Sequence, residues 1–277
     1  MGTGFSAALA AAPVSASEVA ATRQPTERAR TLPGRVYHDP EVFAWEREQW
    51  FRREWLFVGR EEDAPETGSY FLTRVAGENI VVARGNDGVL RAFYNVCRHR
   101  GATILEEESG RIVRFQCPYH AWTYDLEGIL RPPRHTETLE EFSCEAFGLF
   151  PIRCETWRGF VFLNLDWEAA PLANHLGEFP SHFERFPIPA LRRVRRMDYD
   201  VAANWKALME NYAECYHCPG VHPLLNHLTP YNLGGYLPGA GEWAGSWMEL
   251  TGDYETLSTD GYLHGRSAIP GMNEDDL

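Results

Sequence analysis

Short runs of alternating hydrophobic and polar residues dominate the middle of this 277-residue chain. Between positions 56 and 165 they are separated by turn signals such as Asn86-Asp87-Gly88. Strands with a period of two and Gly- or Asn-rich breaks are typical of an all-β module. The runs at 89–94, 112–116 and 160–165 are its most clearly predicted strands. We therefore expect one β-rich domain over residues 56–165.

Two segments show helical spacing instead. The first begins at Asp39-Pro40, a typical N-cap followed by a first-turn proline, and is expected to end near position 55. The side chains expected to be buried along it are Phe43, Trp50, Phe51 and Trp55. The second begins near position 204, and its apolar positions are Trp205, Leu208, Met209, Tyr212 and Tyr216. Pro219-Gly220 is expected to stop this helix, which places His217 in its last turn.

Composition and charge narrow the class of protein. The hydrophobic content of 44% is ordinary for a globular chain, and no apolar run approaches the ~18 residues of a membrane helix. The net charge of −13 disfavours nucleic-acid binding, so we expect neither a nucleic-acid nor a membrane partner. The N-terminal residues lack the basic start and long apolar core of a signal peptide, and residues 1–34 are expected to form a disordered arm. Six cysteines without an obvious pairing pattern fit a reducing cytoplasm.

One stretch carries four residues at metal-ligand spacing. It reads Cys97-Arg98-His99, then seventeen residues, then Cys117-Pro118-Tyr119-His120. Each loop offers one sulfur and one nitrogen, which suits a [2Fe–2S] cluster with both thiolates on one iron and both imidazoles on the other, the Rieske arrangement. Zinc sites more often combine a Cys-x-x-Cys knuckle with a His-x₃₋₅-His helix. Ligand type alone still leaves a zinc-stabilised module open.

A second constellation lies at the end of the predicted helix. His217 and His222 are five residues apart, with Pro219-Gly220 between them, so the chain must turn to bring the imidazoles together. Two histidines and one carboxylate with open positions form the facial triad of non-haem Fe(II) oxygenases. A single histidine here would more often be an ordinary helix-end side chain. Glu214 lies three residues before His217, on the same face of the predicted helix.

Cys215 and Cys218 form a Cys-x-x-Cys pair in the same segment. Redox-active pairs open a helix, where the dipole lowers the thiol pKa. These two are expected to close one, so we interpret them as small hydrophobic side chains, and Cys144 and Cys154 likewise.

The first motif, Cys-Arg-His-Arg-Gly followed by Cys-Pro-Tyr-His-Ala-Trp-Thr-Tyr-Asp-Leu-Glu-Gly, resembles the Rieske domain of the ring-hydroxylating oxygenase family. The resemblance implies that Cys97, His99, Cys117 and His120 hold the cluster. It also implies that Tyr124 hydrogen-bonds near the cluster, where such contacts tune the reduction potential.

The segment 204–223 resembles the mononuclear-iron motif of the same family, and His217 and His222 match its two histidine ligands. The resemblance implies that Asn211 lies near the iron. It implies that Glu214 hydrogen-bonds His217 and bridges to His120 of a neighbouring subunit, so that electrons cross between subunits. Most ring-hydroxylating members have Asp at this position. Glu resembles the branch that acts on the quaternary amines choline, glycine betaine and carnitine.

The family resemblance implies an α+β fold, with an all-β Rieske [2Fe–2S] domain and an incomplete helix-grip catalytic domain of antiparallel sheet and helices. The expected organisation is the arm at 1–34, a helix of the catalytic domain at 35–55, the Rieske domain at 56–165 and a partial mononuclear-iron domain at 166–277. The carboxylates available downstream as a third iron ligand are Asp253, Asp260, Asp275 and Asp276. None matches the family position, so we expect a truncated chain whose iron site is incomplete and inactive.

The implied protein is the catalytic α subunit of a cytoplasmic, homotrimeric oxygenase. It hydroxylates a small organic substrate with O₂ and with NAD(P)H electrons delivered by a ferredoxin or flavin reductase. The expected substrate is a quaternary amine, which would be N-demethylated. An aromatic ring is the alternative, and a protein that only transfers electrons is an alternative of another class. An aromatic cage for a quaternary ammonium group is a further possibility, and its candidates are Tyr231, Tyr236, Trp243 and Trp247.

Overall fold

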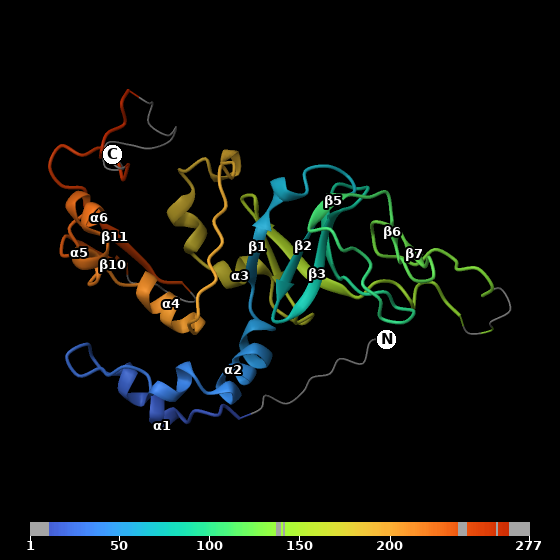
Figure 1. Ribbon diagram of the computed structural model, residues 1–277, viewed down its shortest axis with the longest axis horizontal. Coiled ribbons are helices and arrows are strands. Elements are labelled where there is room, and N and C mark those ends of the chain that lie inside the picture. Colours follow the sequence, from blue (N-terminus) through green and yellow to red (C-terminus); the bar gives the residue numbers. More distant parts are fainter. Residues whose placement is uncertain (1–10, 137–139, 141, 238–242, 259, 266–277) are drawn as a thin grey trace. The chain divides into compact units, whose positions relative to one another are not determined.

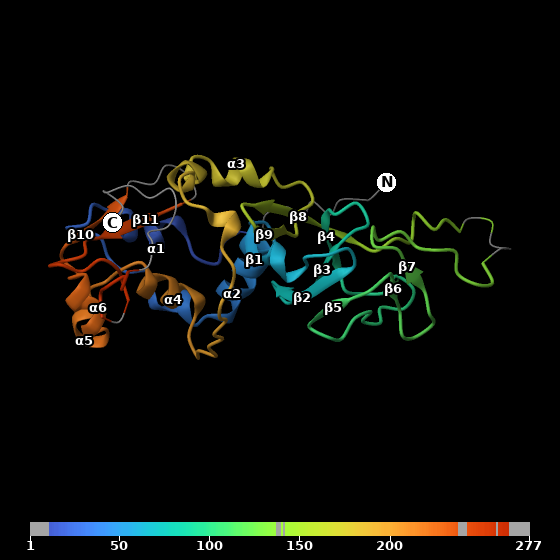
Figure 2. The same ribbon diagram turned by 90° about the horizontal axis from the view of Figure 1, so that it is seen from above.

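The computed structural model describes residues 11–136, 140, 142–237, 243–258 and 260–265. The chain divides into two compact units, Met1–Leu172 and Ala173–Leu277. Figures 1 and 2 show their elements from two directions.

An antiparallel seven-stranded sheet forms the body of the first unit, with the strand order β1-β9-β8-β4-β3-β2-β5. Its strands are β1 (Leu56–Arg60), β2 (Ser69–Val75), β3 (Glu78–Arg84), β4 (Leu90–Tyr94), β5 (Ser109–Arg111), β8 (Pro151–Trp157) and β9 (Phe160–Asn164). The strands predicted at 89–94 and 160–165 are confirmed to within one residue as β4 and β9. The β-rich character predicted for 56–165 is also confirmed.

Strand β3 is buried on both sides of the sheet. Ile80, Val81, Val82 and Ala83 are all fully buried. Side chains alternate along a strand, so Val81 and Ala83 join one hydrophobic core while Ile80 and Val82 join a second core on the opposite face. The continuous apolar run in the sequence is therefore the mark of a strand covered on both faces.

The core on the Val81 side reaches the first metal-type motif. It includes Cys97, Phe115, Cys117 and Tyr124. A separate hairpin supports the second loop of that motif, formed by β6 (Phe115–Gln116) and β7 (Thr123–Tyr124). The strand predicted at 112–116 is therefore limited to its last two residues. Within this unit the hairpin lies at the end opposite β1 (Figures 1 and 2).

The N-terminal segment has more regular structure than the sequence predicts. It contains α1 (Ala16–Val19), η1 (Ala20–Arg23) and η2 (Gly34–Tyr37). The Ser15 side chain caps α1 by accepting a hydrogen bond from the Glu18 N–H, and Arg35 forms an ion pair with Glu18 at 2.7 Å. Local sequence patterns do not predict this contact, because the two residues are 17 positions apart in the chain. Residues 1–10 of the expected disordered arm lie outside the described part.

The first long helix begins as predicted and ends earlier. In α2 (Pro40–Glu46) the Asp39 side chain provides the N-cap, and a π-helical turn, η3 (Arg47–Phe51), completes the helix. Trp55 is buried as expected. Phe43 and Trp50, however, are 47% and 41% exposed, so their predicted burial is wrong. A single 3₁₀ turn, η4 (Glu61–Asp63), follows β1.

The second unit contains short helices and a two-stranded antiparallel sheet, which fits the expected α+β class. Its elements are α3 (Leu172–Leu176), η5 (Phe179–Phe183), η6 (Ile188–Ala190), α4 (Trp205–Tyr212), α5 (Cys218–Val221), α6 (Pro223–Leu228), β10 (Gly234–Leu237) and β11 (Gly245–Met248). The wider helix-grip sheet is not seen among the residues that the structure describes.

Helix α4 corrects the prediction for the 204–217 segment. Its N-cap is Asn204, but it ends at Tyr212 rather than at His217. Pro219 and Gly220 do not stop a helix, because both lie within α5. Proline is tolerated in the first turn of a helix, where its missing N–H has no intrahelical partner. Trp205 at its start is half-buried, but the rest of the predicted apolar stripe of α4 is exposed, with Tyr212 at 88%.

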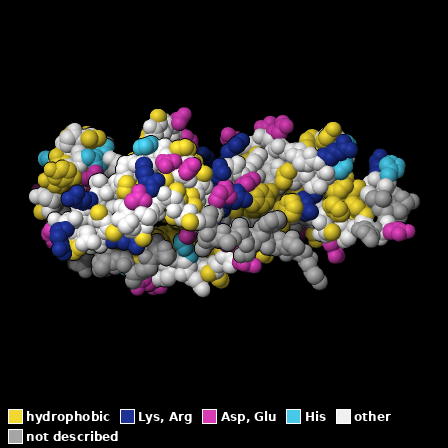
Figure 3. Space-filling view, turned by 90° about the horizontal axis from the view of Figure 1, so that it is seen from below, with side chains coloured by type: hydrophobic (Ala, Val, Ile, Leu, Met, Phe, Trp, Pro, Cys, Tyr) yellow, Lys and Arg dark blue, Asp and Glu magenta, His cyan; other side chains and the backbone are white. Residues whose placement is uncertain are grey.

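Positive and negative side chains are mixed on one face of the molecule (Figure 3). On the face drawn in Figure 3, Lys and Arg are scattered among Asp and Glu rather than gathered in one stripe. No helix in the described part of the chain is long and apolar enough to span a membrane.

Candidate metal centres

Two short loops carry the cysteines and histidines of the first motif, and they fold alike. The Cys97 N–H donates to the carbonyl five residues later at 2.8 Å, and the Gly101 N–H donates to the Cys97 carbonyl at 2.9 Å. The second loop repeats both bonds, at 2.8 Å from the Cys117 N–H and at 3.0 Å from the Ala121 N–H. Gly101 and Ala121 both have positive φ, +71° and +57°. The backbone therefore presents the two cysteines in equivalent loop positions.

The donors separate into a buried sulfur pair and an exposed nitrogen pair. Cys97 and Cys117 are 2% and 3% exposed, whereas His99 and His120 are exposed, with ring centroids 4.7 Å apart. No three His, Cys, Asp or Glu side chains converge on one metal position within the described residues. A sulfur pair and a separate nitrogen pair are the donor set of a two-iron cluster in which thiolates hold one iron and imidazoles the other.

Tyr124 lies directly beside the sulfur pair. Its hydroxyl accepts a hydrogen bond from the Arg98 N–H at 3.0 Å, which leaves its own proton to donate to Cys97 Sγ at 3.4 Å. Burial, and then the hydrogen bond to Cys97, raise the pKa of Tyr124. The phenol therefore stays protonated and serves as a fixed donor to the sulfur. The structure thus places the Tyr124 hydroxyl within hydrogen-bond distance of Cys97 Sγ.

Aromatic neighbours hold the imidazoles, which sequence reasoning missed. Trp122 stacks on His99 with centroids 4.8 Å apart and planes 9° apart, and Tyr119 lies 3.8 Å from the His120 ring. Desolvation lowers the pKa of His99, and the nearby His120 lowers it further. The signal was available in the sequence, because both aromatic residues lie within two positions of His120.

Arg98 ties the first loop to a distant segment. Its guanidinium lies 3.6 Å from the centroid of the Phe150 ring and donates to the Gly148 carbonyl at 2.8 Å. The residue between the two ligand-type side chains is thereby anchored to residues 50 positions away.

The second constellation brings its two histidines together. The rings of His217 and His222 have centroids 5.3 Å apart and planes at 74°. Glu214 Oε1 lies 2.7 Å from His217 Nδ1, and this hydrogen bond lowers the pKa of Glu214. The ionised carboxylate only accepts, so Nδ1 carries the proton and Nε2 is left with its lone pair for a metal.

The backbone achieves this pairing differently from the prediction. Glu214 is not helical, and it reaches His217 across a loop. The four-residue helix α5 separates His217 from His222, and the His222 N–H closes it by donating to the Cys218 carbonyl at 2.8 Å. Asn211 is exposed near the end of α4 and forms no hydrogen bond to either histidine.

The structure also corrects the view of the Cys-x-x-Cys pair. Cys218 is the first residue of α5, so the expectation that the pair closes a helix is wrong. Burial raises the pKa of Cys218 to about 11, which keeps the thiol protonated. Cys215 Sγ lies 3.6 Å from Met248 Sδ. The interpretation of Cys218 as a small buried side chain therefore holds for a different reason.

No carboxylate joins His217 and His222 as a third ligand within the described residues. Asp260 hydrogen-bonds His264 Nε2 at 2.6 Å, and Asp253 lines a cavity beside α6. Asp275 and Asp276 lie outside the described residues.

The four aromatics considered for a cage do not meet. The Tyr231 ring has its centroid 6.0 Å from that of Tyr216, and the Trp243 ring has its centroid 4.7 Å from that of His182. Trp247 packs over the Gly235 backbone in the β10–β11 pair, and Tyr236 is 73% exposed.

A buried thiol pair and an exposed imidazole pair on two equivalent loops define a Rieske-type iron–sulfur protein. Comparison with known families agrees. Residues 54–143 match the Rieske [2Fe-2S] domain, and residues 188–277 match the ring hydroxylating alpha subunit catalytic domain. The chain belongs to the Rieske non-haem iron oxygenase α-subunit family. These two domains imply a Rieske cluster and a non-haem iron.

The chain is similar to oxygenase subunits named for quaternary amines. It is 39% identical to the carnitine monooxygenase oxygenase subunit of Acinetobacter pittii (strain PHEA-2), over 70% of this chain and 53% of that protein. It is 36% identical to the glycine betaine monooxygenase oxygenase subunit of Chromohalobacter salexigens, over 73% of this chain and 45% of that protein. The chain thus spans about half the length of these relatives.

A solved structure of a quaternary ammonium Rieske monooxygenase, described for carnitine oxidation and inter-subunit electron transfer, also matches. The TM-score is 0.70 at 35% identity, over 75% of this chain and 57% of that one.

Proposed function

We propose that this chain acts as the α subunit of an oxygenase that hydroxylates a carbon next to the nitrogen of a quaternary amine. In this proposal Cys97, Cys117, His99 and His120 hold the [2Fe–2S] cluster. His217 and His222 are two ligands of Fe(II). When bound, these groups supply electron transfer and O₂ activation.

One observation carries the proposal: Glu214 is bound to His217 at 2.7 Å beside His222, in a chain that also has the Rieske-type loops. Glu at this position, rather than Asp, resembles the quaternary-amine branch. The relatives named for carnitine and glycine betaine support the same assignment. An arene substrate remains the alternative, and the turnover experiment below separates the two.

The reaction balances as a monooxygenation. One oxygen atom of O₂ enters a C–H bond next to the nitrogen, and the other leaves as water with two electrons and two protons. The N–C bond of the hydroxylated carbon then breaks to give a tertiary amine, an aldehyde and a proton. If the carbon is an N-methyl group, the aldehyde is formaldehyde and the outcome is N-demethylation.

Two side chains of the chain would position the groups that take part in these steps. Glu214 holds the proton on His217 Nδ1 and so fixes the orientation of the imidazole. Tyr124 donates to Cys97 Sγ and stabilises negative charge there. In a homotrimer, the exposed His120 of one subunit would reach Glu214 of the next. NAD(P)H electrons would arrive in the cytoplasm through a ferredoxin or flavin reductase.

Metal analysis of protein purified without oxygen tests the proposal. We expect two labile sulfides and three irons per chain, with one iron lost in His217→Ala and retained in the matched variant Cys215→Ala. One zinc and no sulfide would show that the iron assignments are wrong. Two irons and two sulfides without a third iron would show an electron carrier instead.

Turnover tests the substrate class. A form of the protein that binds the third iron, supplied with a reductase, would be given glycine betaine, carnitine, choline and a panel of arenes, with aldehyde and amine measured. We expect products from the amines only. Oxidation of arenes without any from the amines would refute the amine assignment.

A further inference from the structure

We propose that a cavity in the second unit binds the quaternary ammonium group of the ligand, with Tyr254 and Tyr262 as aromatic walls and Asp253 as the charge partner. This inference deepens the proposed function and takes its biological setting from it. The argument for the site itself rests on the cavity.

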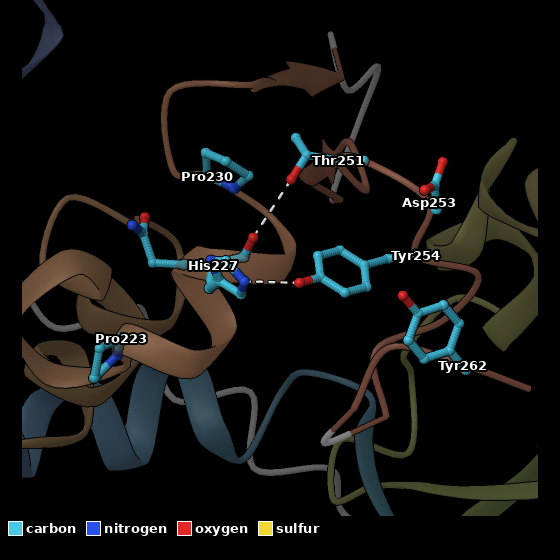
Figure 4. A pocket seen from close by; sticks show the side chains of 9 residues that line it. Pro223, His227, Pro230, Thr251, Asp253, Tyr254 and Tyr262 are labelled. Carbon is cyan, nitrogen blue, oxygen red and sulfur yellow. Dashed lines mark hydrogen bonds between the residues drawn. The ribbon is translucent and has the colours of Figure 1, made fainter.

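The cavity lies between α6 and the segment that follows β11, and it measures about 670 Å³. Its lining residues are Pro223, Asn226, His227, Pro230, Thr251, Gly252, Asp253, Tyr254 and Tyr262 (Figure 4). Pockets for small organic ligands span ~300–1,000 Å³. The volume therefore admits choline or a betaine with room to spare.

Two tyrosine rings form an angled wall. Figure 4 shows Tyr254 pointing toward His227, with Tyr262 beside it. The Tyr254 hydroxyl lies 2.7 Å from His227 Nε2, and the two tyrosine rings have centroids 5.9 Å apart with planes at 58°. Inclined aromatic faces attract quaternary ammonium ions through their negative π-surfaces. Such an ion has no N–H to donate, so aromatic faces suit it better than hydrogen-bond acceptors.

The backbone holds this wall in place. Gly261 has a φ of +82°, and a Cβ there would lie only 2.2 Å from Tyr254 Cδ1. The Glu255 N–H donates to the Gly261 carbonyl at 2.7 Å, which folds Tyr262 back toward Tyr254. The Thr251 N–H donates to the Leu228 carbonyl at 3.0 Å and fastens the segment to α6. The walls are therefore preorganised, which lowers the entropy cost of binding.

The charges around the cavity favour a cation. Among the described residues that line it, none is Lys or Arg, and Asp253 forms no ion pair. The Oδ1 atom of Asn226 accepts a hydrogen bond from the Tyr231 N–H at 3.1 Å. The NH₂ group of the same amide is then the part of Asn226 that can donate to a ligand oxygen. The lining thus offers aromatic faces and a carboxylate to a cation, and one donor to an attached hydroxyl or carboxylate.

The cavity also adjoins the helix that follows the second proposed iron ligand. Pro223, the first residue of α6, directly follows His222 and lines the cavity. A ligand held there lies along the helix that starts at the second histidine. In the proposed function, the cavity would hold the ammonium group of the same substrate.

The test is direct binding to the 277-residue chain without iron, measured by calorimetry with choline. The control ligand is 3,3-dimethylbutan-1-ol, which has the same shape with carbon in place of N⁺. We expect choline to bind about 3- to 10-fold more tightly than this neutral analogue. Tyr262→Leu and Tyr254→Leu should each weaken choline binding by about 3- to 10-fold, and Asp253→Asn by a smaller factor.

Tyr254→Phe keeps the ring and should keep the affinity. Tyr236→Leu, in an exposed tyrosine outside the cavity, is the matched control and should bind as the unchanged chain does. Equal affinity for choline and the neutral analogue, no binding, or equal losses in Tyr236→Leu and Tyr262→Leu would overturn the inference. Near-ultraviolet circular dichroism checks that each variant is folded. Iron content is measured in a separate preparation of the same chain. If that preparation holds its full iron while the iron-free chain does not bind choline, the result refutes this site and leaves the proposed function standing.

Discussion

Tyr124→Phe should change the reduction potential of the iron–sulfur site more than it changes the fold. The Tyr124 side chain is fully buried, so its hydroxyl has no water to replace its two partners. The substitution removes the acceptor of the Arg98 N–H and the donor to Cys97 Sγ, at 3.0 and 3.4 Å. The ring stays in place.

The two losses have different sizes. An N–H left without its acceptor costs about 1–3 kcal/mol of unfolding free energy. Reduction adds one negative charge to the cluster, and hydrogen bonds to charged acceptors are stronger than neutral ones by about 1 kcal/mol. At 59 mV for each tenfold (1.4 kcal/mol) in a one-electron couple, the potential should fall by about 40 mV.

A redox titration of the cluster-loaded protein, followed by electron paramagnetic resonance, measures this shift. Tyr70→Phe is the matched control, since Tyr70 is buried in the same core and its hydroxyl lies beside Gly110. We expect its potential to be unchanged. If Tyr124→Phe shifts the potential by less than about 10 mV, the hydroxyl does not stabilise the reduced cluster and the reasoning fails.

Three further predictions concern the first unit. Gly128→Ala should destabilise the chain by about 2–5 kcal/mol in urea unfolding, because its φ is +85° and a Cβ would lie 2.4 Å from Phe93 Cε1; a smaller loss would mean that the ring moves freely. Gly101→Ala should lower the free energy of unfolding by about 1 kcal/mol, whereas Ala121→Gly should leave it unchanged or raise it, because both positions have positive φ. The opposite order in urea unfolding would contradict the shared loop geometry. Cys154, whose pKa burial raises to about 12, should resist iodoacetamide at pH 8 until the chain is unfolded, and rapid labelling of the folded protein would show that it is accessible.

The sequence predicted features that depend on local spacing. Cys97, His99, Cys117 and His120 are identified by their order and separation, and the structure separates them into a buried pair and an exposed pair. The predicted N-cap at Asp39 is confirmed for the same reason, because capping involves neighbours along the chain. The helix length predicted from residue spacing was wrong, because the helix expected to reach His217 ends at Tyr212.

The sequence did not predict the contacts between segments that are far apart along the chain. Tyr254 lies 27 positions from His227, and no local pattern links the two. The candidate cage that included Trp243 and Trp247 was chosen for proximity in sequence, and the structure gives these rings different neighbours.

By itself the sequence determined the chemistry of the chain: the sulfur and nitrogen donors, the Glu and two His of the second motif, and a β-rich domain around the first. Only the tertiary structure decided which donors are buried, how Glu214 reaches His217 across a loop, and which aromatic rings line a cavity. The physical reason is that donor identity is a property of single residues, whereas burial and enclosure arise from packing between segments far apart in the chain.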